Sequence, residues 1–332
     1  MSGDGGRRRA GFTLIELLLV IIILAAIAGA AVATLETATG DASVRGEDTR
    51  NRLERIRTAI LGPDGATTPQ GFVADVGRLP YLESPGIGQV SGLIELVENR
   101  NDVPTWRGPY VRTLPGPGGL EFPDGWGNSI ATGATGADAN SFGWHVERFD
   151  DQAEADAYNT GPHGPEVTTA PVASGDLLVQ SYGIDHQPNG TAAFAVDYPA
   201  LPLIRVDDYL VPIAGKQLRV TVHVADNDVA GIVHSCRLHF GGPAGEAWTA
   251  YGDPTPGAPL ALGANSLTFV FHDVETDALN RYVERIPIGR LRLEVLFTSA
   301  SASSRAFQTE LDVIARSPLR DVHASRVVEV GP

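Results

Sequence analysis

The feature that most constrains the fold of this chain is an apolar stretch near its N terminus, Phe12 to Leu35. The stretch has 24 residues, and its only charged residue is Glu16. As a helix it would be about 36 Å long at roughly 1.5 Å per residue, which exceeds the bilayer core of about 30 Å. Three arginines at positions 7–9 precede it, and such a cluster keeps that end of an apolar run in the cytoplasm. The pattern predicts a single-pass anchor with everything after Leu35 outside the cytoplasm.

Three details distinguish this stretch from a secretory signal peptide. Signal peptides have an apolar core of about 7–15 residues, followed by a small-residue cleavage site. Here the run is longer, the small residues Ala10 and Gly11 come before it, and it holds a carboxylate that is costly without a partner. Cleavage after Gly11 explains all three, because the new amine of Phe12 then lies about one helical turn from Glu16, and the carboxylate of one subunit can neutralise the amine of the next. A plain anchor and a cleaved signal peptide are the alternatives.

The residues G-F-T-L-I-E at positions 11–16 resemble the N-terminal signature of the type IV pilin and pseudopilin superfamily. This resemblance implies that a prepilin peptidase removes the leader, residues 1–11, and that Phe12 is N-methylated. It also implies assembly through the transmembrane helix, residues 12–35, with Phe12 and Glu16 as the assembly pair.

A second set of motifs follows the helix. In chain order they are D-V-G-R-L-P at 75–80, W-R-G-P-Y at 106–110, D-G-W-G-N at 124–128 and S-Y-G-I-D at 181–185. This series resembles the head of the G-type major pseudopilin of type II secretion. Aromatic, Gly and Pro residues between short apolar segments are compatible with a small sheet on a helix. Core packing is the preferred interpretation of the aromatic residues in these motifs.

The sequence predicts an α+β fold, in which a long N-terminal helix packs on a small antiparallel sheet and an all-β, sandwich-like domain follows. Residues 36–62 continue the helix outside the membrane, because Leu53, Ile56 and Ile60 lie on one helical face and Gly62-Pro63 stops the pattern. Residues 63–197 form the pseudopilin-like head, with an insertion at about 131–176 that is interpreted as a solvated surface segment.

Residues 198–332 form the β-rich C-terminal domain and resemble no recognised family. Alternating and apolar segments predict strands at 218–224, 232–240, 266–271, 291–297 and 307–314. Short strands with Gly and Pro turns, and without a convincing amphipathic helix, favour a β-sandwich.

The loop after S-Y-G-I-D is the candidate metal site, because G-type pseudopilins bind calcium in the corresponding loop. Asp185, Asn189 and Asp197 would supply side-chain oxygens, and backbone carbonyls the rest of the six to eight that calcium takes. The acidic run usual in this loop is replaced by the apolar-rich residues 191–196, so a plain turn is the alternative.

Composition excludes several function classes. A net charge of −15 argues against wrapping nucleic acid, and the single cysteine, Cys236, excludes an intramolecular disulfide. Strand alternation places His234 and Cys236 on one face and His239 on the other, which disfavours a shared zinc ion. No G-x-S-x-G, H-E-x-x-H or P-loop motif occurs, so an enzyme is not expected.

Two functions from different classes follow from these observations. The first is a structural subunit of a type II secretion pseudopilus, held in the inner membrane with a cytoplasmic N terminus before cleavage and a periplasmic C-terminal region. Its partners would be other copies, other pseudopilins and an inner-membrane platform with a cytoplasmic ATPase. The second is a minor pilin or adhesin-like subunit that displays the C-terminal domain at a fibre tip. The head motifs favour the first function, and the extra domain favours the second.

Overall fold

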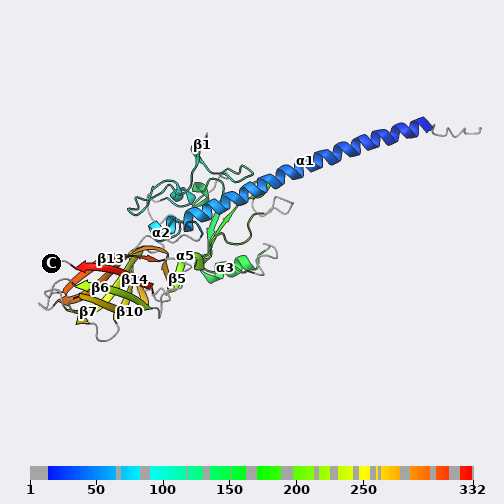
Figure 1. The fold of residues 1–332 in the computed structure, drawn as a ribbon. Helices are drawn as coiled ribbons and strands as arrows, with labels where there is room; N and C mark the ends of the chain where they lie inside the picture. The colour runs from blue at the N-terminus through cyan, green and yellow to red at the C-terminus, as the bar shows by residue number, and fades with distance from the viewer. Residues whose placement is uncertain are drawn as a thin grey trace, which may run out of the picture.

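The computed structural model combines a long helix, a small mixed head and a large sheet (Figure 1). It describes residues 14–64, 69–82, 90–116, 119–129, 135–149, 151–161, 170–187, 197–212, 217–224, 231–241, 247–254, 259–260, 263–276, 285–299, 304–313 and 322–330. Helices and small antiparallel sheets occur together, which confirms the predicted α+β class.

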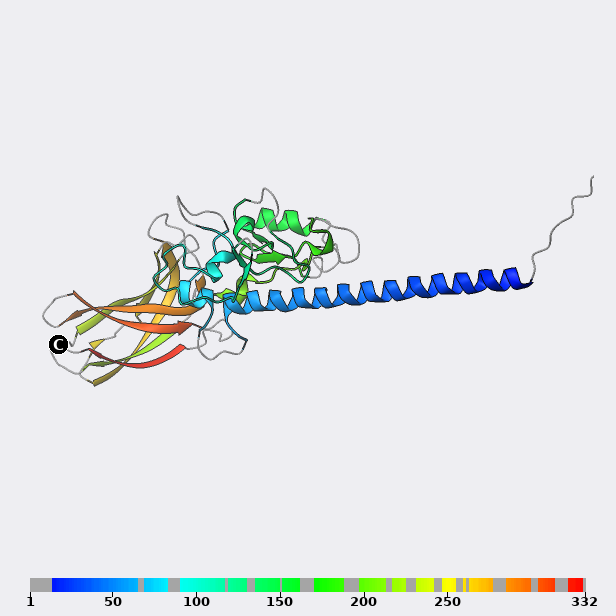
Figure 2. The ribbon, with the colours of Figure 1, turned by 90° about the horizontal axis from the view of Figure 1, so that it is seen from above.

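Helix α1, Leu14–Leu61, has 48 residues, and its N-terminal half extends away from the rest of the chain (Figures 1 and 2). Its predicted apolar face is buried, since Leu53, Ile56 and Ile60 are at most 4% exposed. The helix ends where predicted, because Gly62 has a φ of +88° that L-residues rarely adopt. A side chain at Gly62 would also lie 2.6 Å from the carbonyl oxygen of Gln70.

The head is built from short elements around the C-terminal part of α1. Helix α2 is Phe72–Val76, and the 3-10 turns are η1, Leu93–Leu96, η2, Asp138–Asn140, and η3, Gly183–Asp185. The hairpin pairs β1, Leu114–Gly116, with β2, Gly119–Glu121, and a second antiparallel pair joins β3, His145–Arg148, to β4, Leu177–Gln180. The predicted small antiparallel sheet is therefore divided among separate two-stranded sheets.

The insertion is more ordered than the predicted solvated segment. Between β3 and β4 it contains helix α3, Gln152–Asn159, whose N-cap Asp151 accepts a hydrogen bond from the amide of Glu154 at 2.9 Å. A small separate core holds α3 in place: Phe149, Ala155, Val172 and Leu178, with Tyr158 packed against them. The acidic side chains of α3 remain exposed, as predicted.

The C-terminal region forms one eight-stranded sheet in the order β13-β12-β7-β8-β10-β6-β14, with β9 paired to β7. Its strands are β6 Gln217–Val224, β7 Gly231–Gly241, β8 Ala247–Pro254, β9 Pro259–Leu260, β10 Gly263–Thr276, β12 Gly289–Ser299, β13 Ser304–Val313 and β14 Val322–Val330. All five predicted strands are present, and β8, β9 and β14 were missed. Two stacked sheets are not confirmed, because the strands share one hydrogen-bonded ladder that curls until its end strands, β13 and β14, approach each other (Figure 2).

One hydrophobic core joins the head to the large sheet at strand β12. Strand β5, Leu210–Pro212, pairs with β11, Arg285–Pro287, and places Val211 opposite Ile286. Both side chains, together with Leu293 of β12, belong to the core that contains the buried face of α1. Helix α5, Val206–Tyr209, leads into β5. The predicted boundary at residues 197 and 198 stays a prediction, and core side chains lie on both sides of it.

Candidate functional site

The predicted processing and assembly residues lie at the start of α1. Gly11 and Phe12 fall outside the residues that the structure describes, and Glu16 lies in the first turns of the helix. Their roles therefore stay predictions.

The helix just after Glu16 exposes a continuous apolar surface. The large side chains from Leu18 to Leu24, and Ile27, are 45–61% exposed. Isolated exposed apolar residues are common, but a run of this size is typical of a surface that contacts other proteins or lipid.

No helix in the described part of the chain is both long enough and apolar enough to cross a membrane. The transmembrane span at 12–35 stays a prediction.

The last two head motifs, far apart in the sequence, meet around the carboxylate of Asp124, which is 3% exposed. One oxygen accepts hydrogen bonds from the backbone amides of Trp126, at 3.0 Å, and Asn128, at 2.9 Å. The other accepts from the side chains of Asn128 and Ser181. The Asn128 amide also donates to the carbonyl of Gly183 at 3.2 Å. The motif residues thus connect two loops by hydrogen bonds.

The first two motifs meet around a buried ion pair. Arg78 and Glu95 are joined at 2.8 Å, with side chains only 3% and 4% exposed. The guanidinium carbon of Arg78 lies 3.3 Å from the ring centre of Tyr81. Burial raises the pKa of Glu95, and Arg78 offsets only part of that effect.

The aromatic residues of the W-R-G-P-Y motif pack around this pair. The indole of Trp106 donates to the backbone carbonyl of Glu95 at 2.8 Å and meets Tyr110 edge to face at 5.6 Å. The Tyr110 hydroxyl donates to Asp75 at 2.8 Å, and burial raises its pKa well above the ordinary value. These contacts are those of core packing.

The loop predicted to bind calcium is only partly described. Asp185 ends η3, is exposed, and accepts a hydrogen bond from the amide of Gln187 at 3.2 Å. Asn189 falls outside the described residues, and Asp197 is half-buried. The described residues contain no group of three or more His, Cys, Asp or Glu side chains arranged for a metal ion. In β7, His239 lies 3.3 Å from Glu294 of the neighbouring strand.

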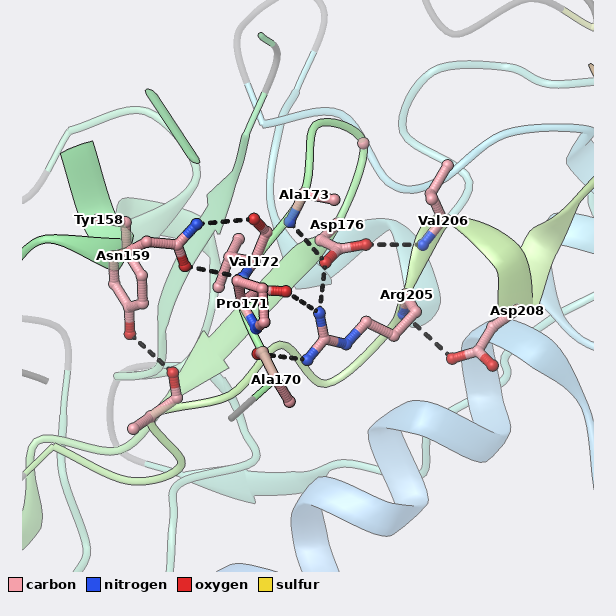
Figure 3. A network of polar contacts seen from close by, with 12 residues as sticks. Tyr158, Asn159, Ala170, Pro171, Val172, Ala173, Asp176, Arg205, Val206 and Asp208 are labelled. Atoms are coloured by element: carbon pink, nitrogen blue, oxygen red, sulfur yellow. Dashed lines mark hydrogen bonds and ion pairs between the residues drawn. The ribbon is translucent and has the colours of Figure 1, made fainter. Parts of the chain in front are cut away.

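A polar network that the motifs did not indicate anchors the end of the insertion to the segment that leads into α5 (Figure 3). Asp176 has no exposed surface, and Arg205 pairs with it at 3.1 Å. The amides of Ala173 and Val206 donate to the same carboxylate at 3.0 and 2.8 Å. The guanidinium of Arg205 also donates to the carbonyls of Ala170 and Pro171. Arg57 of α1 lies 3.3 Å from Asp208, which accepts from the Arg205 amide, so the network reaches the long helix.

The exposed apolar surface and the early position of Glu16 agree with a comparison of the sequence with known families. Residues 6–32 match the prokaryotic N-terminal methylation motif. This motif includes Gly11, Phe12 and Glu16, and it implies a type IV pilin-like chain that prepilin peptidase processes and that assembles with other pilins. No curated protein and no solved structure matches the chain. The methylation motif ends before the head begins, so it does not distinguish one pilin-like role from another.

Proposed function

We propose that this chain is a structural subunit of a type II secretion pseudopilus. Prepilin peptidase cuts it after Gly11, and the N terminus at Phe12 is methylated. An inner-membrane platform with a cytoplasmic ATPase then extrudes it, with other pseudopilins, into a periplasmic fibre that drives protein export. The methylation motif at residues 6–32 carries the pilin-like part of this proposal, and the head motifs, which resemble those of the G-type major pseudopilin, favour the pseudopilus.

The exposed apolar surface of α1 supports assembly through the helix. Its large apolar side chains from Leu18 to Leu24, and Ile27, are exposed, so they are available to lipid before assembly and to neighbouring helices after it. In the membrane the chain is a single-pass protein with the head and sheet in the periplasm. Among the packed helices of the assembled fibre, Glu16 of one copy neutralises the amine of Phe12 in the next. This favours the assembled state over the lone subunit.

Replacing Glu16 tests this proposal. A lone carboxylate in the bilayer costs at least about 2.5 kcal/mol on insertion scales, so Glu16→Leu should leave membrane insertion intact. Cleavage should persist, because the peptidase acts at Gly11. Assembly, measured by cross-linking between subunits, should fail. The control Glu36→Gln removes a charge beyond the apolar stretch and should assemble normally. If Glu16→Leu assembles as well as the wild type, the carboxylate is not the assembly contact.

Calcium binding at Asp185 belongs to the same proposal. The side-chain oxygens would come from Asp185, whose carboxylate is exposed, and from Asn189 and Asp197. Binding to the native state alone would add about 2.7 kcal/mol of stability at a hundredfold excess over Kd. Melting of the full chain in detergent should therefore rise with calcium relative to chelator, and Asp185→Asn should abolish the rise. Identical melting curves for the wild type with calcium and with chelator would mean that the loop is a plain turn and does not bind calcium.

A minor pilin or adhesin-like subunit is the second candidate. One observation favours it: the eight-stranded sheet lies at the end of the molecule opposite the free half of α1 (Figure 1), where a fibre tip would present it. Counting subunits in sheared surface material separates the two functions. A major subunit greatly outnumbers its partners, whereas a tip subunit is rare.

A further inference from the structure

An open groove of about 540 Å³ lies where the C-terminal end of α1 meets the chain before β1. Its apolar lining includes Ala59 of α1 with Val111 and Phe122, all of them buried. Two arginines, Arg55 and Arg112, also line it, and both are exposed. The groove therefore has an apolar floor and a cationic rim.

The β1–β2 hairpin stands beside this groove, because β1 begins two residues after Arg112 and β2 ends one residue before Phe122. It exposes two leucines: Leu114 is 72% and Leu120 38% accessible. Exposed leucines beside a groove with an apolar floor extend the apolar area that a partner can cover, which is typical of a protein-binding surface.

The lining of the groove is net positive, whereas the whole chain is net negative. Glu54 is the acidic residue among its lining, against the two arginines, while the whole chain carries −15. Within the described part of the chain, Arg55 and Arg112 have no ion-pair partner. Identical chains with this net charge repel one another, so close packing of copies needs a local contact between opposite charges.

Helix α3 has the complementary chemistry. It exposes Glu154 and Asp156 after the N-cap Asp151, and the helix Gln152–Asn159 contains no basic residue. Its buried residue Ala155 holds it against the insertion core, so its carboxylates are presented on a fixed element. In Figure 1 the hairpin and α3 lie on opposite sides of α1, so the two surfaces of one copy do not meet.

We propose that the groove and hairpin of one copy bind α3 of the next copy. The inference rests on the proposed function, since it places the contact between neighbouring heads of the assembled fibre. Arg55 and Arg112 pair with the acidic residues of α3, and the hairpin leucines cover the adjacent surface. Because the two patches differ, the contact is head-to-tail and repeats from copy to copy, as an open helical array requires.

Cysteine cross-linking of the full chain in membranes tests the contact. In a Cys236→Ser background, which removes the only native cysteine, Arg112→Cys and Glu154→Cys are combined in one chain. Oxidation should give a ladder of covalent multimers. The control pairs Glu154→Cys with Arg100→Cys, at an exposed arginine of the head that pairs with Glu98 and does not line the groove, and should give no ladder. Cross-linking of Arg112→Cys to another protein, or no ladder, would overturn the proposal.

Charge reversal provides a second readout. In the Cys236→Ser background, with the cross-linking pair moved to Leu114→Cys and Ala157→Cys, Arg112→Glu should lower the yield of intermolecular cross-links about tenfold. Adding Glu154→Arg to the same chain should restore the yield, because every copy then carries the reversed pair. Arg100→Glu should leave the yield unchanged. Loss without restoration by the reversed pair would contradict the assigned partner.

A reporter on the helix separates failure of this contact from failure of the proposed function. Ile27→Cys, on the exposed surface of α1, should cross-link between copies whenever the helices assemble. If Ile27→Cys cross-links while the Arg112–Glu154 pair does not, the head contact is wrong and helix assembly stands. If neither cross-links, both proposals are wrong.

Discussion

His145 lies between two carboxylates, with Asp138 at 3.0 Å and Glu147 at 3.5 Å, and stacks on Tyr182. Burial alone lowers the pKa of the imidazole, but hydrogen bonds and charge from the two carboxylates outweigh it and raise the pKa to about 9. The protonated imidazole therefore joins strand β3 to the turn η2 in the folded chain.

The raised pKa of His145 predicts a loss of stability at alkaline pH. The protonated ring contributes its full stabilisation below the unfolded pKa of about 6.5, and this is lost as the pH rises through the folded value. Denaturation of the detergent-solubilised chain between roughly pH 6 and pH 10 should show that loss in the wild type and not in His145→Gln. Parallel curves for the two proteins would contradict the assignment.

Gly125 sits against the backbone of α1. A Cβ there would collide with the carbonyl oxygen of Arg45 and lie 2.9 Å from the amide nitrogen of Thr49. Gly125→Ala should therefore destabilise the fold by about 2 kcal/mol or more, since a helix backbone must move. Gly46→Ala is the matched control: it has free space around it within α1, and it should stabilise by up to about 1 kcal/mol. Chemical denaturation should show that the free energy of unfolding falls in Gly125→Ala and rises in Gly46→Ala.

At the scale of elements, a polar network adds to the β3–β4 pairing in holding the insertion in place. Asp176 precedes β4, and Arg205 immediately precedes α5. Their contact brings these elements together, and Asp208 extends it to Arg57 of α1. A buried carboxylate is stable only while its partners neutralise and hydrogen-bond it.

Removing the cation from this network should therefore be costly. Arg205→Met leaves the carboxylate of Asp176 buried with two amide donors, and should lower the free energy of unfolding by about 2–4 kcal/mol. Arg285→Met, which removes an ion pair with the exposed Asp207, should cost less than about 1 kcal/mol. Equal effects on unfolding in denaturant would mean that the burial of Asp176 is not what makes the contact important.

At the scale of the whole molecule, the shared core determines how the head and the large sheet unfold. Leu293 of β12 has no exposed surface and belongs to the same cluster as Ile56 and Ile60 of α1. Gly289, at the start of β12, reinforces this junction, because a Cβ there would lie 2.5 Å from the carbonyl oxygen of Ala74. The two parts should lose structure together.

Truncating Leu293 tests this coupling. Leu293→Ala should destabilise the chain by about 2–5 kcal/mol and increase hydrogen exchange both in β12 and in α1 around Ile56. Leu114→Ala makes the same chemical change on the exposed hairpin and should alter the free energy of unfolding by less than about 0.5 kcal/mol. Faster exchange confined to the sheet would show that the head folds independently.

Local patterns in the sequence were sufficient for the features that depend on nearest neighbours. The spacing of Leu53, Ile56 and Ile60 predicted the buried face of α1, and Gly62-Pro63 predicted its end, because helix periodicity and termination depend on adjacent residues. The residues around Gly11 predicted the methylation motif that the family comparison found at 6–32.

Only the tertiary structure could decide which distant residues meet. Asp124 joins Ser181 across 57 positions, and Asp176 joins Arg205 across 29, and no local pattern specifies such pairs. Alternation predicted strands in the C-terminal region but not their order, because alternation says which face a residue occupies and not which strand is its neighbour. The curled single sheet, and the core it shares with α1, arise from contacts between segments far apart in the chain, which only folding brings together.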